Sequence, residues 1–311
     1  MTRARWVLFA YHTIGARALE ALVARGEEVA AVVTHADDPG EGSWFESVAE
    51  MARIHGIPCF APASPNVRAI VETVRGLAPD LILSVWYRQL LGSELLALPR
   101  VAALNLHGSL LPAYRGRAPL NWVLVNGEPQ TGVTLHHMAA TADAGDIVAQ
   151  RTIEIEPDET AIALYERMTK IGVELLVDTY PAVLAGTAGR VPQDDARATT
   201  MPRRRPEDGR IDWAWPAARI FNIIRAVAEP YPGAFVGDGP SRLFLWASAT
   251  PDERFRDAEP GTIVAIVPSR GVAVATGAGV LVITRVQGAG GVAEPADRWA
   301  ARRGLRPGAR L

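Results

Sequence analysis

Short apolar runs alternate with stretches of helical periodicity over the first two hundred residues. Residues 6–11 and 29–34 are apolar, and residues 16–24 between them place apolar side chains on one helical face. Further strands are expected at residues 81–85, 101–106, 132–138 and 147–155, and further helices at residues 45–55, 67–77, 90–98 and 160–184. This alternation is typical of parallel βαβ units, so it predicts an α/β fold with a Rossmann-like, doubly wound and mostly parallel sheet.

The pattern changes after residue 184. Residues 185–209 lose periodicity and gather Gly, Pro and Thr, with three consecutive arginines at 203–205, a composition typical of a domain boundary. A helix is expected at residues 217–228, followed by short β-rich runs near residue 235 and at residues 243–246, 262–267, 272–276 and 280–286. We therefore expect a Rossmann-like domain at residues 1–203 and a smaller OB-like β-barrel domain at residues 204–311.

Composition narrows the class of protein. The chain has 311 residues and a net charge of −2, which argues against a surface that binds polyanions as a whole. Residues 1–200 carry 16 basic and 23 acidic side chains, a net −7, whereas residues 201–311 carry 16 and 11, a net +5. No apolar run is long enough to span a membrane or resembles a signal peptide, and Cys59 is the only cysteine, so we expect a cytoplasmic protein.

Several common motifs are missing from the places where they would be expected. The first strand is followed by His12-Thr-Ile-Gly15 and not by a glycine-rich turn, which argues against NAD binding. The glycines at residues 288–291 come late and fit a hairpin turn better than a phosphate cradle. His136 and His137 are adjacent on a predicted strand and would point to opposite faces, so we expect no metal site there.

One strand end carries candidate chemistry. Asn105 and His107 lie at the carboxyl end of the strand at 101–106, and the alternation of a strand places both side chains on one face. The imidazole can accept a proton near neutral pH, and the amide can donate to the oxygen of a carbonyl under attack. Asp143 or Asp146, in the segment after the strand at 132–138, could orient the imidazole. The same spacing also fits a structural histidine at a strand end.

At these residues the chain resembles a known family. Asn105-Leu-His107, the following Ser109-Leu-Leu-Pro112 and Asp143 are similar to the signature of the 10-formyltetrahydrofolate-dependent formyltransferases. Supporting similarities lie at residues 9–12, 34–41, 224–228 and 230–235, so the resemblance covers essentially the whole chain. It is strongest to the UDP-4-amino-4-deoxy-L-arabinose formyltransferase domain of bifunctional polymyxin-resistance proteins.

The resemblance implies a role for each motif residue. Asn105 would stabilise the transition state, His107 would transfer the proton and Asp143 would raise the pKa of the histidine, which leaves Asp146 as a turn residue. Gln89 stands where the related domain has a histidine. The residues implied to contact folate are Gln89, Leu90, Leu91, Arg117, Ala139, Ala140, Thr141, Ala142 and Asp143.

The implied activity is transfer of the formyl group of 10-formyltetrahydrofolate, as co-substrate, to the 4-amine of UDP-4-amino-4-deoxy-L-arabinose, a step in lipid A modification and polymyxin resistance. The expected partners are the folate and the UDP-amino sugar. We expect the protein to bind no metal ion, no NAD and no nucleic acid. The related bifunctional proteins also carry a nicotinamide-dependent decarboxylase domain. We expect no such domain in this sequence, so decarboxylation is not expected.

Two alternatives stay open. Methionyl-tRNA formyltransferase shares the signature and the two-domain plan, but the acidic residues Asp37, Asp38 and Glu41 would repel phosphates. A non-catalytic protein that binds folate or a nucleotide sugar is the other alternative, although such a protein would have no need to keep Asn105, His107 and Asp143 together. The oligomeric state is open as well.

Overall fold

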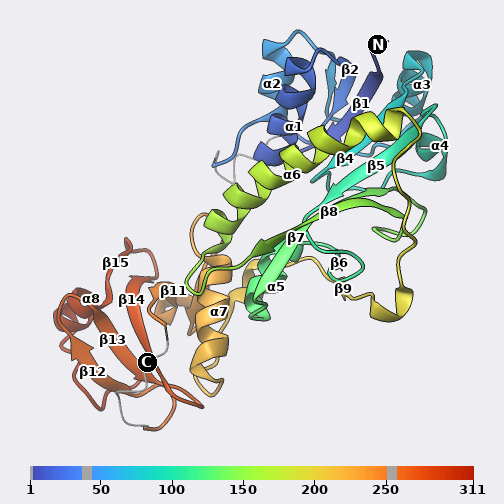
Figure 1. Ribbon diagram of the computed structural model, residues 1–311. Helices are drawn as coiled ribbons and strands as arrows, with labels where there is room; N and C mark the ends of the chain where they lie inside the picture. The colour runs from blue at the N-terminus through green and yellow to red at the C-terminus, as the bar shows by residue number, and fades with distance from the viewer. Residues whose placement is uncertain (1–2, 37–43, 251–257) are drawn as a thin grey trace. The chain divides into compact units, whose positions relative to one another are not determined.

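The computed structural model describes residues 3–36, 44–250 and 258–311 (Figure 1). The acidic residues 37, 38 and 41 therefore lie outside the described residues. The chain divides into two compact units. The first unit is made of residues 1–119, 131–153 and 166–201, and the second of residues 120–130, 154–165 and 202–311. The predicted boundary between residues 203 and 204 stays a prediction.

The first unit is built on a seven-stranded sheet with the order β3-β2-β1-β4-β5-β7-β8. Its strands are β1 (Arg5–Ala10), β2 (Glu28–Val33), β3 (Cys59–Phe60), β4 (Leu81–Val85), β5 (Ala102–His107), β7 (Gln130–His137) and β8 (Ile147–Glu154). The strands from β1 to β5 are parallel, and β7 runs antiparallel to β5. The prediction of a Rossmann-like, mostly parallel sheet is confirmed. Because the chain moves from one side of β1 to the other, the carboxyl ends of β1 and β4 lie at the switch point where such sheets bind ligands.

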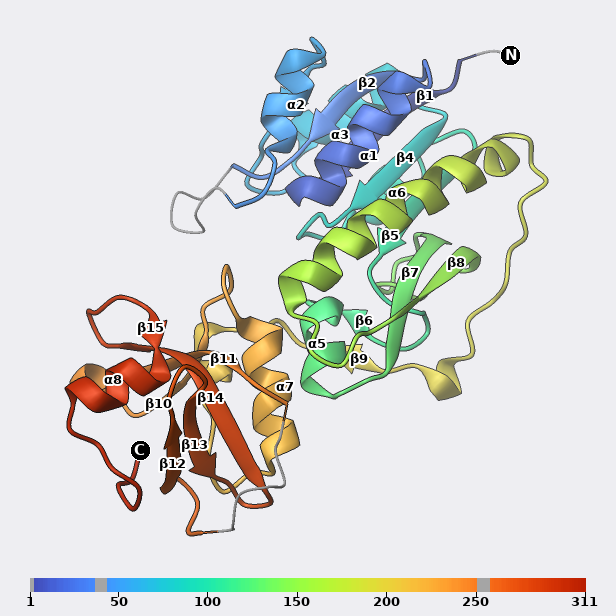
Figure 2. The same cartoon turned by 60° about the vertical axis from the view of Figure 1, so that its left-hand side comes forward.

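Helices cover both faces of this sheet (Figure 2). They are α1 (His12–Ala24), α2 (Val48–Ile54), α3 (Arg68–Leu77), α4 (Ser93–Leu96) and α6 (Ala161–Leu184). On one face, Ile70 and Val74 of α3 pack with Phe9 of β1 and Ala103 of β5. On the other face, Gly172 of α6 lies close to the side chains of Leu106, Ile14 and Val133. β5 therefore turns its even-numbered residues toward α6 and its odd-numbered residues, which include Asn105 and His107, to the opposite face.

Two helices are shorter than their sequence patterns predict. The helix expected at 45–55 begins at Val48, because the Ser47 side chain accepts a hydrogen bond from the Glu50 amide and caps the helix there. The helix expected at 90–98 is α4, which begins only after Gly92, whose amide donates to the Asn66 side chain at 2.7 Å. In both cases the apolar periodicity of the sequence extends beyond the start of the helix. The residues before that start are not helical, because a side-chain hydrogen bond fixes where the helix begins.

The second unit is built on an antiparallel sheet with the order β10-β11-β14-β13-β12, and β15 pairs with β14. Its strands are β10 (Ala234–Val236), β11 (Leu243–Ser248), β12 (Ile263–Val267), β13 (Gly271–Ala275), β14 (Val280–Gly288) and β15 (Glu294–Pro295). Its helices are α5 (Pro119–Val125), α7 (Ala217–Val227) and α8 (Ala296–Arg302). All five predicted β-rich runs are strands, so a second, β-rich domain is confirmed.

Short elements complete the chain. In the first unit β6 (Arg115–Gly116) pairs with β9 (Thr200–Met201), and this pairing ties the segment after the candidate site to a distant part of the chain. The 3₁₀ helices are η2 (Asp195–Arg197), η3 (Pro206–Gly209) and η4 (Gly239–Ser241). None of the helices in the described ranges is both long and apolar enough to cross a membrane.

Candidate active site

Asn105 and His107 lie on one face at the carboxyl end of β5, in the first unit. His107 is only 7% exposed, and the segment that follows turns back on it. Its Nε2–H donates to the main-chain carbonyl of Tyr114 at 2.9 Å. Because a carbonyl oxygen can only accept, the proton of the neutral ring is fixed on Nε2, and Nδ1 is left as the basic atom.

Asp143 faces both side chains from the segment between β7 and β8. Its Oδ1 lies 3.5 Å from Nδ1 of His107 and accepts from Nδ2 of Asn105 at 3.2 Å. Its Oδ2 accepts from the Gly116 amide at 2.8 Å. The three residues singled out from the sequence are thus brought together, with the carboxylate opposite the basic ring nitrogen.

The backbone around Asp143 is held in a demanding conformation. Asp143 has a φ of +54°, in the left-handed region that Asp tolerates better than most residues. The Gln193 side chain donates to the carbonyls of Asp143 and Gly145, both at 2.7 Å. Gly145 leaves no space for a side chain, because a Cβ there would lie 1.9 Å from the His137 carbonyl oxygen. The carboxylate is therefore positioned by a clamped turn.

Burial and charge act on the two ionisable groups in opposite directions. Burial lowers the pKa of His107 below its usual value; Asp143 and the Tyr114 carbonyl act to raise it, but burial prevails. For Asp143, burial alone would raise the pKa, yet the pKa lies well below its usual range, because the His107 and His136 rings attract the carboxylate when protonated and the Gly116 amide donates to it. The site thus holds an ionised carboxylate beside a neutral histidine that can accept a proton.

His136 belongs to this group, although the sequence reasoning used it only to argue against a metal. Its Nδ1–H donates to the His137 carbonyl at 2.8 Å, so Nε2 accepts from Nδ2 of Asn105 at 3.0 Å. The residue is buried and lies directly across from Asn105 in the pairing of β5 with β7. Both amide protons of Asn105 are engaged as a result, one by His136 and the other by Asp143.

Asp146 occupies a different position from Asp143. Its carboxylate is paired with Arg190, with Oδ2 lying 3.0 Å from the nearer guanidinium nitrogen. Spacing along the sequence left both aspartates as candidates to orient the imidazole. In the structure Asp143 faces His107, and Asp146 is part of a surface ion pair.

The residues implied to contact folate have varied environments. Gln89 donates to the Ala63 carbonyl at 2.9 Å, and Arg117 donates to the Arg88 carbonyl at 2.6 Å. Leu90 is 67% exposed, whereas Leu91 is 8% exposed and packs in the core beside α3. The remaining residues implied to contact folate are the exposed Ala139, Ala140 and Thr141 and the half-buried Ala142 and Asp143.

A basic and aromatic group lies at the ends of β1 and β4, where the sheet order switches. The Arg88 guanidinium lies 4.6 Å from the centre of the Tyr11 ring and 3.2 Å from Nε2 of His12. The Arg88 amide donates to Nε2 of His35 at 3.0 Å. Burial, followed by the charges of Arg88 and His35, lowers the pKa of His12 to about 3, so His12 is neutral. Arg117 connects this group with the catalytic residues. Its guanidinium donates to the Arg88 carbonyl, and the preceding residue, Gly116, donates its amide to Asp143. The sequence reasoning did not identify this group, because its members come from separate loops.

Across the described ranges no group of three or more His, Cys, Asp or Glu side chains is arranged to bind a metal ion.

Comparison with protein families gives two matches. The family model described as formyl transferase matches residues 7–180, and the model of the formyl transferase C-terminal domain matches residues 204–304. Together they cover both the unit that holds Asn105, His107 and Asp143 and the antiparallel sheet.

Solved structures with the same fold include three informative ones. HypX from Aquifex aeolicus in complex with tetrahydrofolic acid is 20% identical with a TM-score of 0.65, and the match covers 99% of this chain and 49% of HypX. The chain thus spans about half the length of HypX. An N-formyltransferase from Helicobacter canadensis in complex with folinic acid and dTDP-3-aminofucose is 18% identical with a TM-score of 0.67, covering 91% of this chain and 98% of that one. A methionyl-tRNA formyltransferase from Clostridium thermocellum is 18% identical with a TM-score of 0.57, covering 80% and 94%.

Proposed function

Because the chain belongs to the formyl transferase family, we propose that it transfers the formyl group of 10-formyltetrahydrofolate to the amine of a nucleotide-linked amino sugar. The observation that carries this proposal is the hydrogen-bonded group of Asn105, His107 and Asp143 at the end of β5. It combines a neutral base, a donor for a developing oxyanion and a carboxylate that stabilises the protonated base. The folate and amino-sugar complexes of proteins with this fold support the choice of both substrates.

In the proposed reaction the amine nitrogen of the sugar attacks the formyl carbon. The amine loses a proton to Nδ1 of His107, since Nε2–H is held by the Tyr114 carbonyl. The new C–N bond makes the formyl carbon tetrahedral and its oxygen an oxyanion, and as the C=O bond re-forms, the bond between that carbon and N10 of the folate breaks. The electron pair of that bond goes to N10, which takes the proton back from His107. The products are a formamide on the sugar and tetrahydrofolate.

Asn105 must change a hydrogen bond to take part. Both of its amide protons are engaged, at 3.0 Å to His136 and at 3.2 Å to Asp143. When Nδ1 of His107 becomes protonated, it gains an N–H directed at Oδ1 of Asp143 and competes for that oxygen. The amide proton of Asn105 is then released toward the oxyanion. Proton uptake and oxyanion stabilisation are coupled through one carboxylate oxygen in this scheme.

For the acceptor we propose UDP-4-amino-4-deoxy-L-arabinose, which would place the enzyme in lipid A modification and polymyxin resistance. The support is the sequence resemblance around residues 105–138 and the cationic side chain of Arg88, which suits a diphosphate. A tRNA acceptor is the second candidate, favoured by the net charge of +5 over residues 201–311 and by the methionyl-tRNA formyltransferase with the same fold.

The test is formyl transfer from 10-formyltetrahydrofolate with three acceptors in parallel. These are UDP-4-amino-4-deoxy-L-arabinose, dTDP-3-aminofucose and methionyl initiator tRNA. The proposal expects transfer to the UDP sugar with the highest kcat/KM of the three. Transfer to tRNA alone would refute the amino-sugar acceptor while keeping the catalytic roles, and transfer to none would refute the activity.

A further inference from the structure

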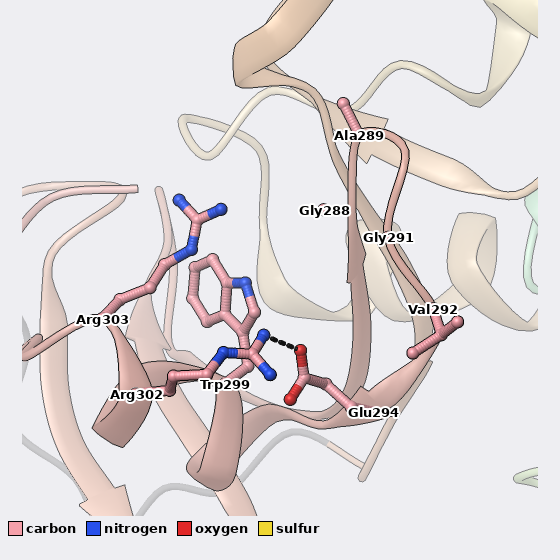
Figure 3. A pocket seen from close by; sticks show the side chains of 8 residues that line it. All are labelled: Gly288, Ala289, Gly291, Val292, Glu294, Trp299, Arg302 and Arg303. Carbon is pink, nitrogen blue, oxygen red and sulfur yellow. Dashed lines mark hydrogen bonds and ion pairs between the residues drawn. The ribbon is translucent and has the colours of Figure 1, made fainter.

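A second candidate binding site lies in the second unit, apart from the catalytic residues. It is a cavity of about 230 Å³ between the turn that joins β14 to β15 and the helix α8 (Figure 3). The turn contributes Gly288 and Gly291, and the helix contributes Trp299, Arg302 and Arg303. Neither family resemblance nor the proposed reaction makes use of these residues.

The clearest sign that the cavity takes a ligand is the indole of Trp299. The residue is 4% exposed, and its Nε1–H has no hydrogen-bond partner among the residues that the structure describes. A buried N–H without an acceptor is costly, so native proteins rarely leave one. Nε1 lies close to Gly288, since a Cβ at that residue would be 4.0 Å from it. Both residues line the cavity, so the indole nitrogen lies beside a part of the wall that has no side chain.

The charge of the cavity is positive. Arg302 is hydrogen-bonded to Glu294, so these two charges neutralise each other (Figure 3). Arg303 lies over the Trp299 ring, 5.1 Å from its centre, and within the described ranges it has no ion pair. A Cβ at Gly288 would lie 3.4 Å from Nη2 of Arg303, so the guanidinium and the indole N–H reach the same small space.

A second, larger cavity shares part of the wall of the first. That cavity has a volume of about 350 Å³ and shares Gly288, Trp299 and Arg303 with the first. It adds Arg242, whose buried Nε also lacks a partner among the described residues, and the apolar side chain of Leu305. The indole N–H and the Arg303 guanidinium thus line both cavities. A ligand could place a small charged group beside these donors and a larger, partly apolar part in the second cavity.

We propose that Trp299 and Arg303 bind the phosphoryl group of a small phosphorylated molecule. A phosphoryl group presents three oxygens, which can accept from donors that arrive in different directions, as the indole N–H and the guanidinium do. The second cavity, beside Arg242, would hold the body of the ligand. Inorganic phosphate has the same chemistry and is the minimal ligand of the site. The site belongs to the second unit, so its test does not depend on formyl transfer.

The test uses the indole N–H signals of the full chain in two-dimensional ¹H–¹⁵N NMR. The chain has eight tryptophans, and the signal that disappears in Trp299→Phe belongs to Trp299. We expect this signal to move saturably when inorganic phosphate is added against sodium chloride of equal ionic strength. A parallel titration with UMP identifies the source of the phosphoryl group: tighter binding of UMP points to a phosphorylated organic ligand, and equal binding points to free phosphate. Either result supports the site.

Two variants test the geometry separately from the charge. Gly288→Ala places a methyl group at van der Waals distance from both donors, and Arg303→Gln removes the cation. Arg303→Gln should weaken phosphate binding at least about tenfold, as expected for a lost hydrogen bond to a charged group. Gly288→Ala should weaken it to a similar extent, because the added methyl group occupies the space beside both donors. Arg298→Gln, at an exposed arginine of the same helix, is the matched control and should stay within about twofold. A shift of the Trp299 signal that chloride reproduces, or equal effects of Arg298→Gln and Arg303→Gln, would overturn the proposal.

Discussion

Replacing Asp143 by Asn tests the electrostatic part of the proposed mechanism. Asn has nearly the same shape, tolerates the φ of +54° at this position and can still accept the Gly116 hydrogen bond. The variant loses the negative charge that lies 3.5 Å from Nδ1 of His107, together with the oxygen that accepts from the Asn105 amide. Since that nitrogen becomes positive only when it takes up the proton of the amine, the charge matters in the transition state and little in the resting enzyme.

The expected loss follows from the distance. Unit charges 3.5 Å apart attract by about 5 kcal/mol at an effective dielectric constant of about 20, and by about 1 kcal/mol in water. The side chains of His107 and Asp143 are only 7% and 14% exposed, so the interaction is stronger than it would be in water. We therefore expect the barrier to rise by about 3 kcal/mol, which lowers kcat about a hundredfold.

The assay is single-turnover formyl transfer measured between pH 5 and pH 9. The carboxylate acts to raise the pKa of His107, so its removal lowers that pKa and moves the acid limb of the rate profile to lower pH, while the maximum rate falls. Asp146→Asn is the matched control, because it removes a carboxylate three residues away that pairs with Arg190 and not with His107. A rate for Asp143→Asn within about threefold of Asp146→Asn, with the same acid limb, would refute the reasoning.

Three further outcomes are expected. In the unaltered enzyme, burial lowers the pKa of His107, so kcat/KM should fall only below about pH 6.5 in a pH titration; a decline that begins above pH 7 would contradict this. His107→Ala should lower kcat by about 10²–10⁴ in rapid-quench assays with an unchanged circular dichroism spectrum, and normal turnover would exclude His107 as the base. Gly145→Ala should reduce the free energy of unfolding in urea by about 1–3 kcal/mol, because its Cβ would collide with the His137 carbonyl. Gly189→Ala, where no atom lies within 4 Å of the added Cβ, is the control and should leave stability nearly unchanged.

The sequence was informative wherever a structural rule acts over a few residues. Strand alternation is such a rule, and it predicted that Asn105 and His107 share a face. The parallel order of the first sheet followed from the regular exchange of strands and helices. The helices α5 and α8, of seven residues each, were not predicted. The equally short α2 was predicted, because its apolar periodicity continues into the residues on either side.

Residues that enter the site from distant segments had no such local signal. His136 reaches Asn105 because β7 pairs antiparallel with β5 in one particular register, which the sequence of neither strand specifies. Gln193 comes from a stretch expected to be a linker, yet its side chain clamps the turn of Asp143. The Tyr114 carbonyl determines which nitrogen of His107 is basic. Because it is a main-chain group, the identities of the side chains could not predict its role. Spacing along the sequence likewise left Asp143 and Asp146 open, and before the structure only the family resemblance favoured Asp143.

The interleaved course of the chain has a consequence for its synthesis on the ribosome. Residues 120–130 and 154–165 belong to the second unit but emerge long before most of it. Asn121 finds its acceptor, the carbonyl of Ala226, only after about a hundred more residues have been translated. Arg225, once made, donates to the carbonyls of Glu156 and Glu159. At translation rates of about 5–20 residues per second, the early segments remain without these native partners for several seconds, an interval in which a chaperone has access to them.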